Sequence, residues 1–150
     1  MTDPTDFWRE AMRRGMGQTA FLRALGGELL EFEAGRGRIR LPFQDHLVGD
    51  PATGVIHGGV LTALLDQACG MAIGSALRSP AAMATLDLRI DYMKPAAPRL
   101  DVLVESQCLK IAHEVAFARA TAFQTAPDEP VAIATGTFML TRLDANAVRP

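Results

Sequence analysis

The spacing of hydrophobic and polar positions changes along the chain and separates a helical segment from a strand-forming segment. Residues 60–77 form an almost unbroken apolar run in which Asp66 is the only charged residue. A run of this length predicts a buried helix, which ends before Pro80 because proline cannot continue it. Residues 85–92 instead alternate strictly between polar and apolar side chains, which predicts a strand with one buried face. That face would carry Leu86, Leu88, Ile90 and Tyr92.

The other elements are predicted from turn residues and from shorter patterns. Residues 4–16 predict a short amino-terminal helix. A turn at Ala34-Gly35 predicts that the strands flanking it form a hairpin. Residues 43–54 are rich in turn formers and predict a loop. The expected strands cover residues 28–33, 36–41, 85–92, 100–110, 115–123 and 131–141.

Small residues share one face of the last two predicted strands. They are Ala116, Ala118, Ala120, Ala122, Ala132, Ala134 and Gly136. An exposed sheet surface normally carries Thr, Lys or Glu, whereas small side chains let a helix backbone approach closely. We therefore expect an α+β fold in which one antiparallel sheet wraps around the long central helix. Residues 1–150 would form a single domain, with a core at about residues 25–142.

Composition narrows the class of protein. The 150 residues carry 15 basic and 17 acidic side chains, and the net charge is −2. The charges are scattered, so no basic stripe indicates nucleic-acid binding. Cys69 and Cys108 lack metal-ligand and disulfide spacing, and the amino terminus lacks a signal pattern, so we expect a cytoplasmic protein. His57 and Asp66 in the long apolar stretch argue against a membrane span.

The start of the long helix combines two features of acyl-transfer sites. The apolar run follows His57-Gly58-Gly59, and two glycines at a helix start leave outward-pointing N–H groups that suit a negative charge. Asp66 lies further along the same helix. A carboxylate in such apolar surroundings lowers the stability of the fold unless it is solvated or paired, so an unpaired one suggests a functional role. The side chains one turn away are small and leave room for substrate or water. They are Thr62, Ala63, Cys69 and Gly70.

Two segments carry motifs of a known family. The first is Gly54-Val55-Ile56-His57-Gly58-Gly59 with Asp66 further along, and the second is Thr85-Leu86-Asp87-Leu88-Arg89-Ile90-Asp91-Tyr92-Met93-Lys94-Pro95. Together they resemble the hotdog-fold thioesterases, and within these the phenylacetate-pathway (PaaI-type) acyl-CoA thioesterases. The resemblance implies a homodimer or a dimer of dimers (a homotetramer). Such an enzyme hydrolyses acyl-CoA thioesters without a metal or an organic cofactor.

The resemblance also implies roles for individual residues. Asp66 matches the catalytic carboxylate, and Gly58 matches the residue whose N–H polarises the thioester carbonyl. His57 matches the histidine before that glycine, and Thr85 sits where relatives place a hydroxyl that holds the water or the carboxylate. The residues expected to bind substrate are Gly59, Cys69 and Gly70.

Plainer structural explanations stand beside these roles. His57 fits a helix cap better than a direct catalyst. Thr85 is equally explained as an ordinary strand residue, and Cys69 as a small core residue. Whether Asp66 attacks the carbonyl carbon or activates water stays open.

The spacing of Gly58 and Asp66 predicts that two chains share each site. Eight residues separate them, which is about 12 Å along a helix. The groups that act on one carbonyl lie within roughly 3.5 Å of it. We therefore expect Gly58 of one subunit and Asp66 of the partner subunit to form each site, with two sites in a C2 dimer.

Two other functions stay open. Hotdog dehydratases and hydratases of hydroxyacyl thioesters share the expected architecture. Their Phe-Pro-Gly-x-Pro and Pro-Gly-Val motifs are absent here, although Gly59-Val60-Leu61 is faintly similar. The third interpretation is a catalytically weak acyl-CoA-binding protein. It arises because relatives carry Asn or Gln shortly before His-Gly-Gly, where this chain has Pro51 beside Asp50.

Overall fold

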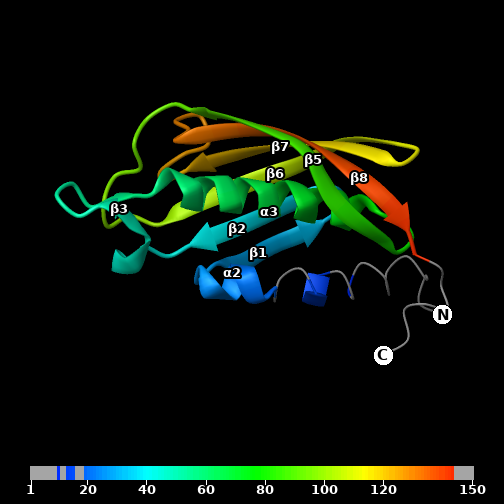
Figure 1. The fold of residues 1–150 in the computed structure, drawn as a ribbon, viewed down its shortest axis with the longest axis horizontal. Coiled ribbons are helices and arrows are strands. Elements are labelled where there is room, and N and C mark those ends of the chain that lie inside the picture. Colours follow the sequence, from blue (N-terminus) through cyan, green and yellow to red (C-terminus); the bar gives the residue numbers. More distant parts are fainter. Residues whose placement is uncertain (1–9, 11–12, 16–18, 144–150) are drawn as a thin grey trace.

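The computed structural model, which describes residues 10, 13–15 and 19–143, has a six-stranded antiparallel sheet wrapped around helix α3 (Gly58–Ala76) (Figure 1). Across the sheet the strands follow the order β1-β2-β6-β7-β8-β5. Their bounds are β1 Glu28–Glu33, β2 Arg36–Leu41, β5 Ala81–Tyr92, β6 Val102–Ala112, β7 Val115–Phe123 and β8 Ala132–Arg142. The predicted α+β architecture is confirmed.

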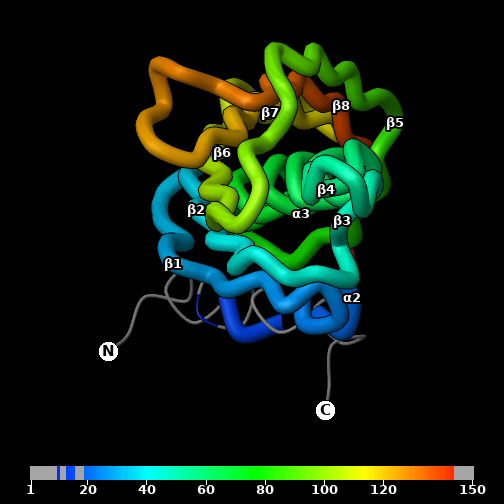
Figure 2. The backbone as a smooth tube through the Cα atoms, turned by 90° about the vertical axis from the view of Figure 1, so that its left-hand side faces the viewer, coloured from blue at the N-terminus to red at the C-terminus, as the bar shows by residue number. Residues whose placement is uncertain are grey.

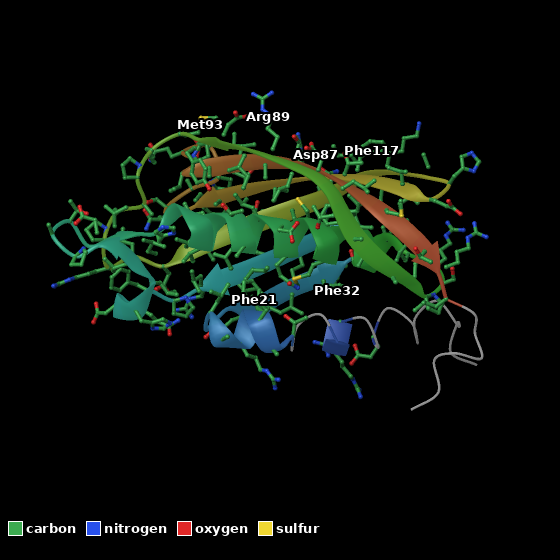
Figure 3. All side chains as sticks on the ribbon, in the orientation of Figure 1. Phe21, Phe32, Asp87, Arg89, Met93 and Phe117 are labelled. Atoms are coloured by element: carbon green, nitrogen blue, oxygen red, sulfur yellow. The ribbon has the colours of Figure 1, made fainter. Side chains whose placement is uncertain are left out.

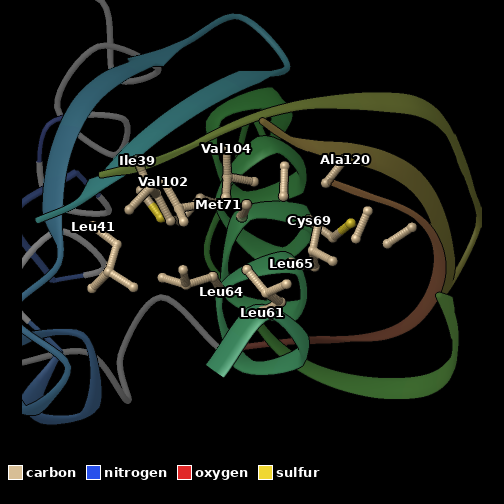
Figure 4. Close-up of a cluster of buried hydrophobic side chains, with 14 of the residues drawn as sticks. Ile39, Leu41, Leu61, Leu64, Leu65, Cys69, Met71, Val102, Val104 and Ala120 are labelled. Carbon is tan, nitrogen blue, oxygen red and sulfur yellow. The ribbon is translucent and has the colours of Figure 1, made fainter. Parts of the chain in front are cut away.

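Helix α3 forms the centre of the core. Its bounds lie within two residues of the predicted run, since it starts at Gly58 and ends at Ala76. Figure 2 shows the helix nearly end-on, enclosed by the curved sheet. Its length and composition would suit a membrane span, but 61% of the 18-residue apolar segment that meets this description is buried inside the fold. Leucines of α3 instead pack against aliphatic side chains of β2 and β6 (Figure 4), among them Ile39 and Val104.

The alanine-rich face packs against α3 as predicted. The β7 alanines at positions 116, 118, 120 and 122 are each at most 1% exposed. Ala120 lies near Cys69 of α3 in the core (Figure 4). Because these side chains are small, β7 packs close to α3, with no layer of large side chains between the strand and the helix.

The first hairpin forms where its turn residues predict it. The φ angles of Ala34 and Gly35 are 38° and 85°, so both residues are in the left-handed region that a tight hairpin turn requires. The turn also touches the carboxyl-terminal end of α3, because the Gly35 N–H donates to the Ser75 hydroxyl at 2.9 Å. The hairpin is therefore bonded directly to the central helix.

Strand β5 contains a bulge that changes which residues face α3. Thr85 and Asp87 pair with successive residues of β8, so Leu86 is an extra residue without a partner. Leu86 is 53% exposed, and the prediction that it shares a buried face with Leu88 is wrong. The bulge brings Thr85 to the helix-facing side instead. Tyr92 lies on that side but is 52% exposed, so its predicted burial is also wrong.

One edge of β5 is open. Among the described residues β5 pairs only with β8, which makes it the last strand of the sheet. Asp87 and Arg89 project from its outer face, away from α3 (Figure 3). An open edge of this length offers unpaired backbone groups to another strand.

The predicted amino-terminal helix is described only in part, and its described residues, 10 and 13–15, are helical. Residues 4–16 lie largely outside the described residues, so that prediction is not tested there. The structure has a short helix α2 (Ala20–Ala24) that the sequence pattern did not predict. The Thr19 hydroxyl caps it by accepting the Leu22 N–H at 3.2 Å, and Gly26 ends it with a φ of 74°.

The predicted loop over residues 43–54 contains short regular structure. A 3-10 turn (Asp45–Leu47) leads into β3 (Val48–Asp50), which pairs with β4 (Val55–Ile56). The loop prediction is wrong for residues 45–50, which form the 3-10 turn and β3. Residues 51–54 form the turn that joins β3 to β4. This hairpin delivers the chain to the start of α3.

Candidate active site

The start of α3 leaves one backbone amide open. The Nδ1 atom of His57 accepts the Gly59 N–H at 2.9 Å, and the His57 carbonyl accepts the Val60 N–H at 2.9 Å. Within the described part of the chain, the Gly58 N–H donates to no acceptor. This amide lies at the positive end of the helix dipole, so it can bind an oxygen that carries negative charge. His57 serves here as the helix cap.

Asp66 is held by a side chain from β5. The Thr85 hydroxyl donates to Asp66 Oδ1 at 2.9 Å. The bulge at Leu86 allows this contact, because it turns Thr85 toward the helix. Asp66 is half-buried, and its Oδ2 atom has no hydrogen-bond partner among the residues described. One carboxylate oxygen is thus fixed while the other stays available.

A single chain does not bring Gly58 and Asp66 together. Both lie on α3, which runs without interruption from Gly58 to Ala76. Their eight-residue separation corresponds to about 12 Å along the helix. The amide and the carboxylate of one chain therefore lie too far apart to act on the same carbonyl group.

Tyr92 also contacts the start of α3, and sequence reasoning missed it as a site residue. Its hydroxyl donates to the Gly58 carbonyl at 3.1 Å and lies 2.7 Å from the Thr62 hydroxyl oxygen. A Cβ atom added at Gly58 would lie 3.6 Å from the tyrosine ring. The available signal was its position as a polar aromatic residue at the end of a strand facing α3.

Comparison with known proteins identifies the family. Residues 53–131 match the model of the thioesterase superfamily. The medium/long-chain acyl-CoA thioesterase YigI of Escherichia coli is 32% identical over 133 residues, which cover 80% of this chain and 84% of that protein. The chain belongs to the thioesterase superfamily.

Solved structures share the fold of this thioesterase-superfamily chain. A crystal structure of a Pseudomonas aeruginosa protein has a TM-score of 0.77 and 36% identity, and the match covers 88% of this chain and 98% of that one. The phenylacetic acid degradation protein PaaI of Thermus thermophilus, solved as a mutant, has a TM-score of 0.70 and 28% identity. That match covers 83% of this chain and 100% of PaaI. The predicted hotdog fold and PaaI-type resemblance are confirmed.

The residues expected to bind substrate in this thioesterase-superfamily chain have different surroundings. Cys69 and Gly70 are buried within the chain, whereas Gly59 is exposed at the start of α3. Burial, and to a lesser degree the charge of Asp66, raises the pKa of the Cys69 thiol to about 12. Cys69 is therefore a thiol rather than a reactive thiolate at neutral pH. Substrate binding by these residues stays a prediction.

The turn before His57 lies where the family resemblance leads us to expect an Asn or Gln side chain. Pro51 is exposed in this turn, and the Gly54 N–H donates to the Asp50 carbonyl at 2.8 Å. The Asp50 carboxylate is used within the turn, where its Oδ1 accepts the Ala52 N–H at 3.0 Å. The turn in this thioesterase-superfamily chain therefore shapes the backbone and offers no side-chain amide. Among the described residues no group of three or more His, Cys, Asp or Glu could hold a metal.

Proposed function

We propose that the protein hydrolyses acyl-CoA thioesters to a free acid and CoA. Asp66 acts as the nucleophile or the general base, and the Gly58 N–H donates to the carbonyl oxygen. One observation carries this proposal: a carboxylate fixed by Thr85 lies on the same apolar helix as the Gly58 amide, which has no acceptor among the described residues. The relative named as an acyl-CoA thioesterase supports this class of substrate.

The two groups meet different demands of the reaction. Attack on the thioester carbonyl puts negative charge on its oxygen. An N–H aimed at that oxygen stabilises the transition state by roughly 3 kcal/mol in other acyl-transfer sites. In the general-base route, Asp66 takes a proton from water while the water oxygen bonds to the carbonyl carbon. The carbon–sulfur bond then breaks, and the CoA thiolate takes up the proton.

The nucleophilic route uses the same groups in a different order. A carboxylate oxygen of Asp66 bonds to the carbonyl carbon, and CoA leaves as the thiolate. Water then hydrolyses the mixed anhydride and regenerates the carboxylate. Single-turnover reaction in ¹⁸O-labelled water separates the routes, because only the nucleophilic route can leave the label in Asp66.

Each site takes its two groups from different subunits. The separation of about 12 Å along α3 prevents one chain from supplying both. A twofold axis that pairs two chains places Gly58 of one beside Asp66 of the partner subunit, which gives two sites in each dimer. The open edge of β5 and the partly exposed first half of α3 support this arrangement. Pairing of such dimers and a cytoplasmic location stay predictions.

A medium or long acyl chain is the proposed substrate group. The E. coli relative at 32% identity carries medium/long-chain acyl-CoA in its name, whereas PaaI is named for phenylacetic acid degradation. Octanoyl- and palmitoyl-CoA are therefore expected to react faster than phenylacetyl-CoA. Initial rates of thiol release rank these substrates.

The variant Asp66→Asn tests the proposed function. Asparagine keeps the shape of the side chain and can still accept the Thr85 hydroxyl, but it can neither attack a carbonyl efficiently nor take a proton. Thiol release from the preferred acyl-CoA is expected to fall about a thousandfold or more. Loss of water from a β-hydroxyacyl-CoA without thiol release would instead identify a dehydratase. Binding of acyl-CoA without turnover by the wild type would identify a binding protein.

A further inference from the structure

The Gly58–Gly59 peptide is fixed by side chains at both of its polar ends. The Gly59 N–H of this peptide donates to His57 Nδ1 at 2.9 Å. The Gly58 carbonyl of the same peptide accepts the Tyr92 hydroxyl at 3.1 Å. The Thr62 hydroxyl adds a further contact at 3.2 Å to this carbonyl. The peptide that follows the open Gly58 N–H therefore has a defined orientation.

Two consecutive glycines make such support necessary. Glycine has more backbone freedom than any other residue, so an unsupported Gly58-Gly59 step would move the neighbouring amide. An oxyanion donor lowers the barrier only to the extent that it is aimed before the reaction starts. Tyr92 supplies a hydrogen bond to the Gly58 carbonyl, and its ring lies 3.6 Å from the place that a Cβ atom at Gly58 would occupy.

The same strand holds both groups of the proposed mechanism. Thr85 of β5 bonds to Asp66, and Tyr92 at the end of β5 bonds to the Gly58 carbonyl. We propose that Tyr92 is a positioning residue that keeps the Gly58 amide aimed at the thioester oxygen through the Gly58 carbonyl. This inference rests on the proposed function, because it assigns how one group of that site is held.

The variant Tyr92→Phe tests this role, because it keeps the ring and removes only the hydroxyl. If Tyr92 aims an amide that acts in the transition state, kcat for the preferred acyl-CoA falls about tenfold. KM is expected to stay within about twofold, because substrate binding in the ground state does not depend on the aimed amide. Thermal unfolding followed by circular dichroism is expected to be close to that of the wild type.

Variants of Thr62 provide a matched pair, because its hydroxyl lies 2.7 Å from the Tyr92 oxygen. Thr62→Val keeps the shape and loses the hydroxyl, so kcat is expected to fall by about threefold to tenfold. Thr62→Ser keeps the hydroxyl and is expected to recover most of that loss. The Tyr92 and Thr62 effects should be non-additive in the double variant, because both hydroxyls act on one carbonyl.

Asp66→Asn distinguishes failure of this inference from failure of the proposed function. If Asp66→Asn is inactive while Tyr92→Phe keeps the wild-type kcat, the Tyr92 role is wrong and the proposed function stands. If Tyr92→Phe only lowers the melting temperature, Tyr92 is a structural residue and the inference is also overturned. If the wild type releases no thiol from any acyl-CoA, the proposed function fails, and the Tyr92 role fails with it. If Asp66→Asn keeps thiol release, the role of Asp66 is wrong but hydrolysis stands, and Tyr92→Phe alone then decides the Tyr92 role.

Discussion

The two halves of α3 have similar apolar sequences but different surroundings. Every residue from 68 to 75 is buried, whereas in residues 58–67 only Leu61, Leu64 and Leu65 are buried. The second half is bonded into the fold, since the Ser75 hydroxyl accepts the Gly35 N–H and lies 2.9 Å from the Ala72 carbonyl. The first half instead carries the open Gly58 amide and Asp66.

This difference shows that a uniform apolar run can serve two purposes. The second half is core, and changes there should act on stability. The first half is left partly uncovered by its own sheet, and it carries the groups that the proposed mechanism needs. Changes there should act on catalysis and on the association of chains.

After Asp66→Asn, the largest effect is expected from removing the Gly58 N–H. Proline is favoured at the first position of a helix, and the residue before it, His57, already has the extended ψ of 133° that a following proline requires. Gly58→Pro should therefore keep the helix and lower kcat/KM by about a hundredfold to a thousandfold.

Gly58→Ala is the matched control, because it keeps the N–H and its Cβ would meet Tyr92 only at an ordinary distance of 3.6 Å. Its loss should be much smaller than that of the proline variant. Equal losses in kcat/KM for the two variants would show that crowding, rather than the missing donor, explains the effect.

The next effect is expected at Thr85. Thr85→Val keeps the shape but removes the hydroxyl that fixes Asp66 Oδ1, so kcat/KM should fall by about tenfold to a hundredfold. Thr85→Ser keeps a hydroxyl and should recover most of the rate. A Val variant as active as wild type would mean that Asp66 needs no partner from β5.

In the buried half of α3, Ser75→Ala should affect stability alone. It leaves the Gly35 N–H without its acceptor, which should lower the free energy of unfolding by about 1–3 kcal/mol in urea titrations. Well below the melting temperature, kcat should not change. The exposed Ser79→Ala serves as a control with an expected change below about 0.5 kcal/mol. A Ser75→Ala protein of wild-type stability would remove the contrast between the two halves.

The last prediction concerns alkylation of Cys69, which we expect to be negligible in the folded protein. Burial raises its pKa to about 12, so at pH 9 about one thiol in a thousand is ionised. Iodoacetamide should leave Cys69 unmodified in the folded protein and modify it in denaturant, as peptide mass spectrometry would show. The rate of Cys69 alkylation should rise as the pH approaches 12, because more of the thiol is then ionised. Rapid alkylation at pH 8 would show that the second half of α3 is open.

Local signals explain which parts of the fold were predictable. The hairpin at Ala34-Gly35 and the helix up to Ala76 depend on turn residues and on a long apolar run, and both formed within two residues of prediction. Helix α2 was missed because a five-residue helix has no clear period, and its capping residue Thr19 is a weak signal on its own.

The candidate site was predictable only in part, because its contacts depend on strand register. Gly58, His57 and Asp66 share one continuous segment, so their order could be interpreted from sequence alone. The Thr85 contact follows from the bulge at Leu86, which is set by pairing with β8, whereas Tyr92 keeps the face that alternation predicts and its contact depends on where the end of β5 meets α3. A strictly alternating sequence carries no mark of such a bulge.

The most direct test of the account is to mix two inactive variants. Gly58→Pro and Asp66→Asn chains are co-expressed, and thiol release is compared with that of each variant alone. If each site draws on two chains, every mixed dimer contains one intact site, and random pairing gives about a quarter of the wild-type rate per chain. Activity no higher than that of either variant alone, in samples shown to contain mixed dimers, would contradict the shared site.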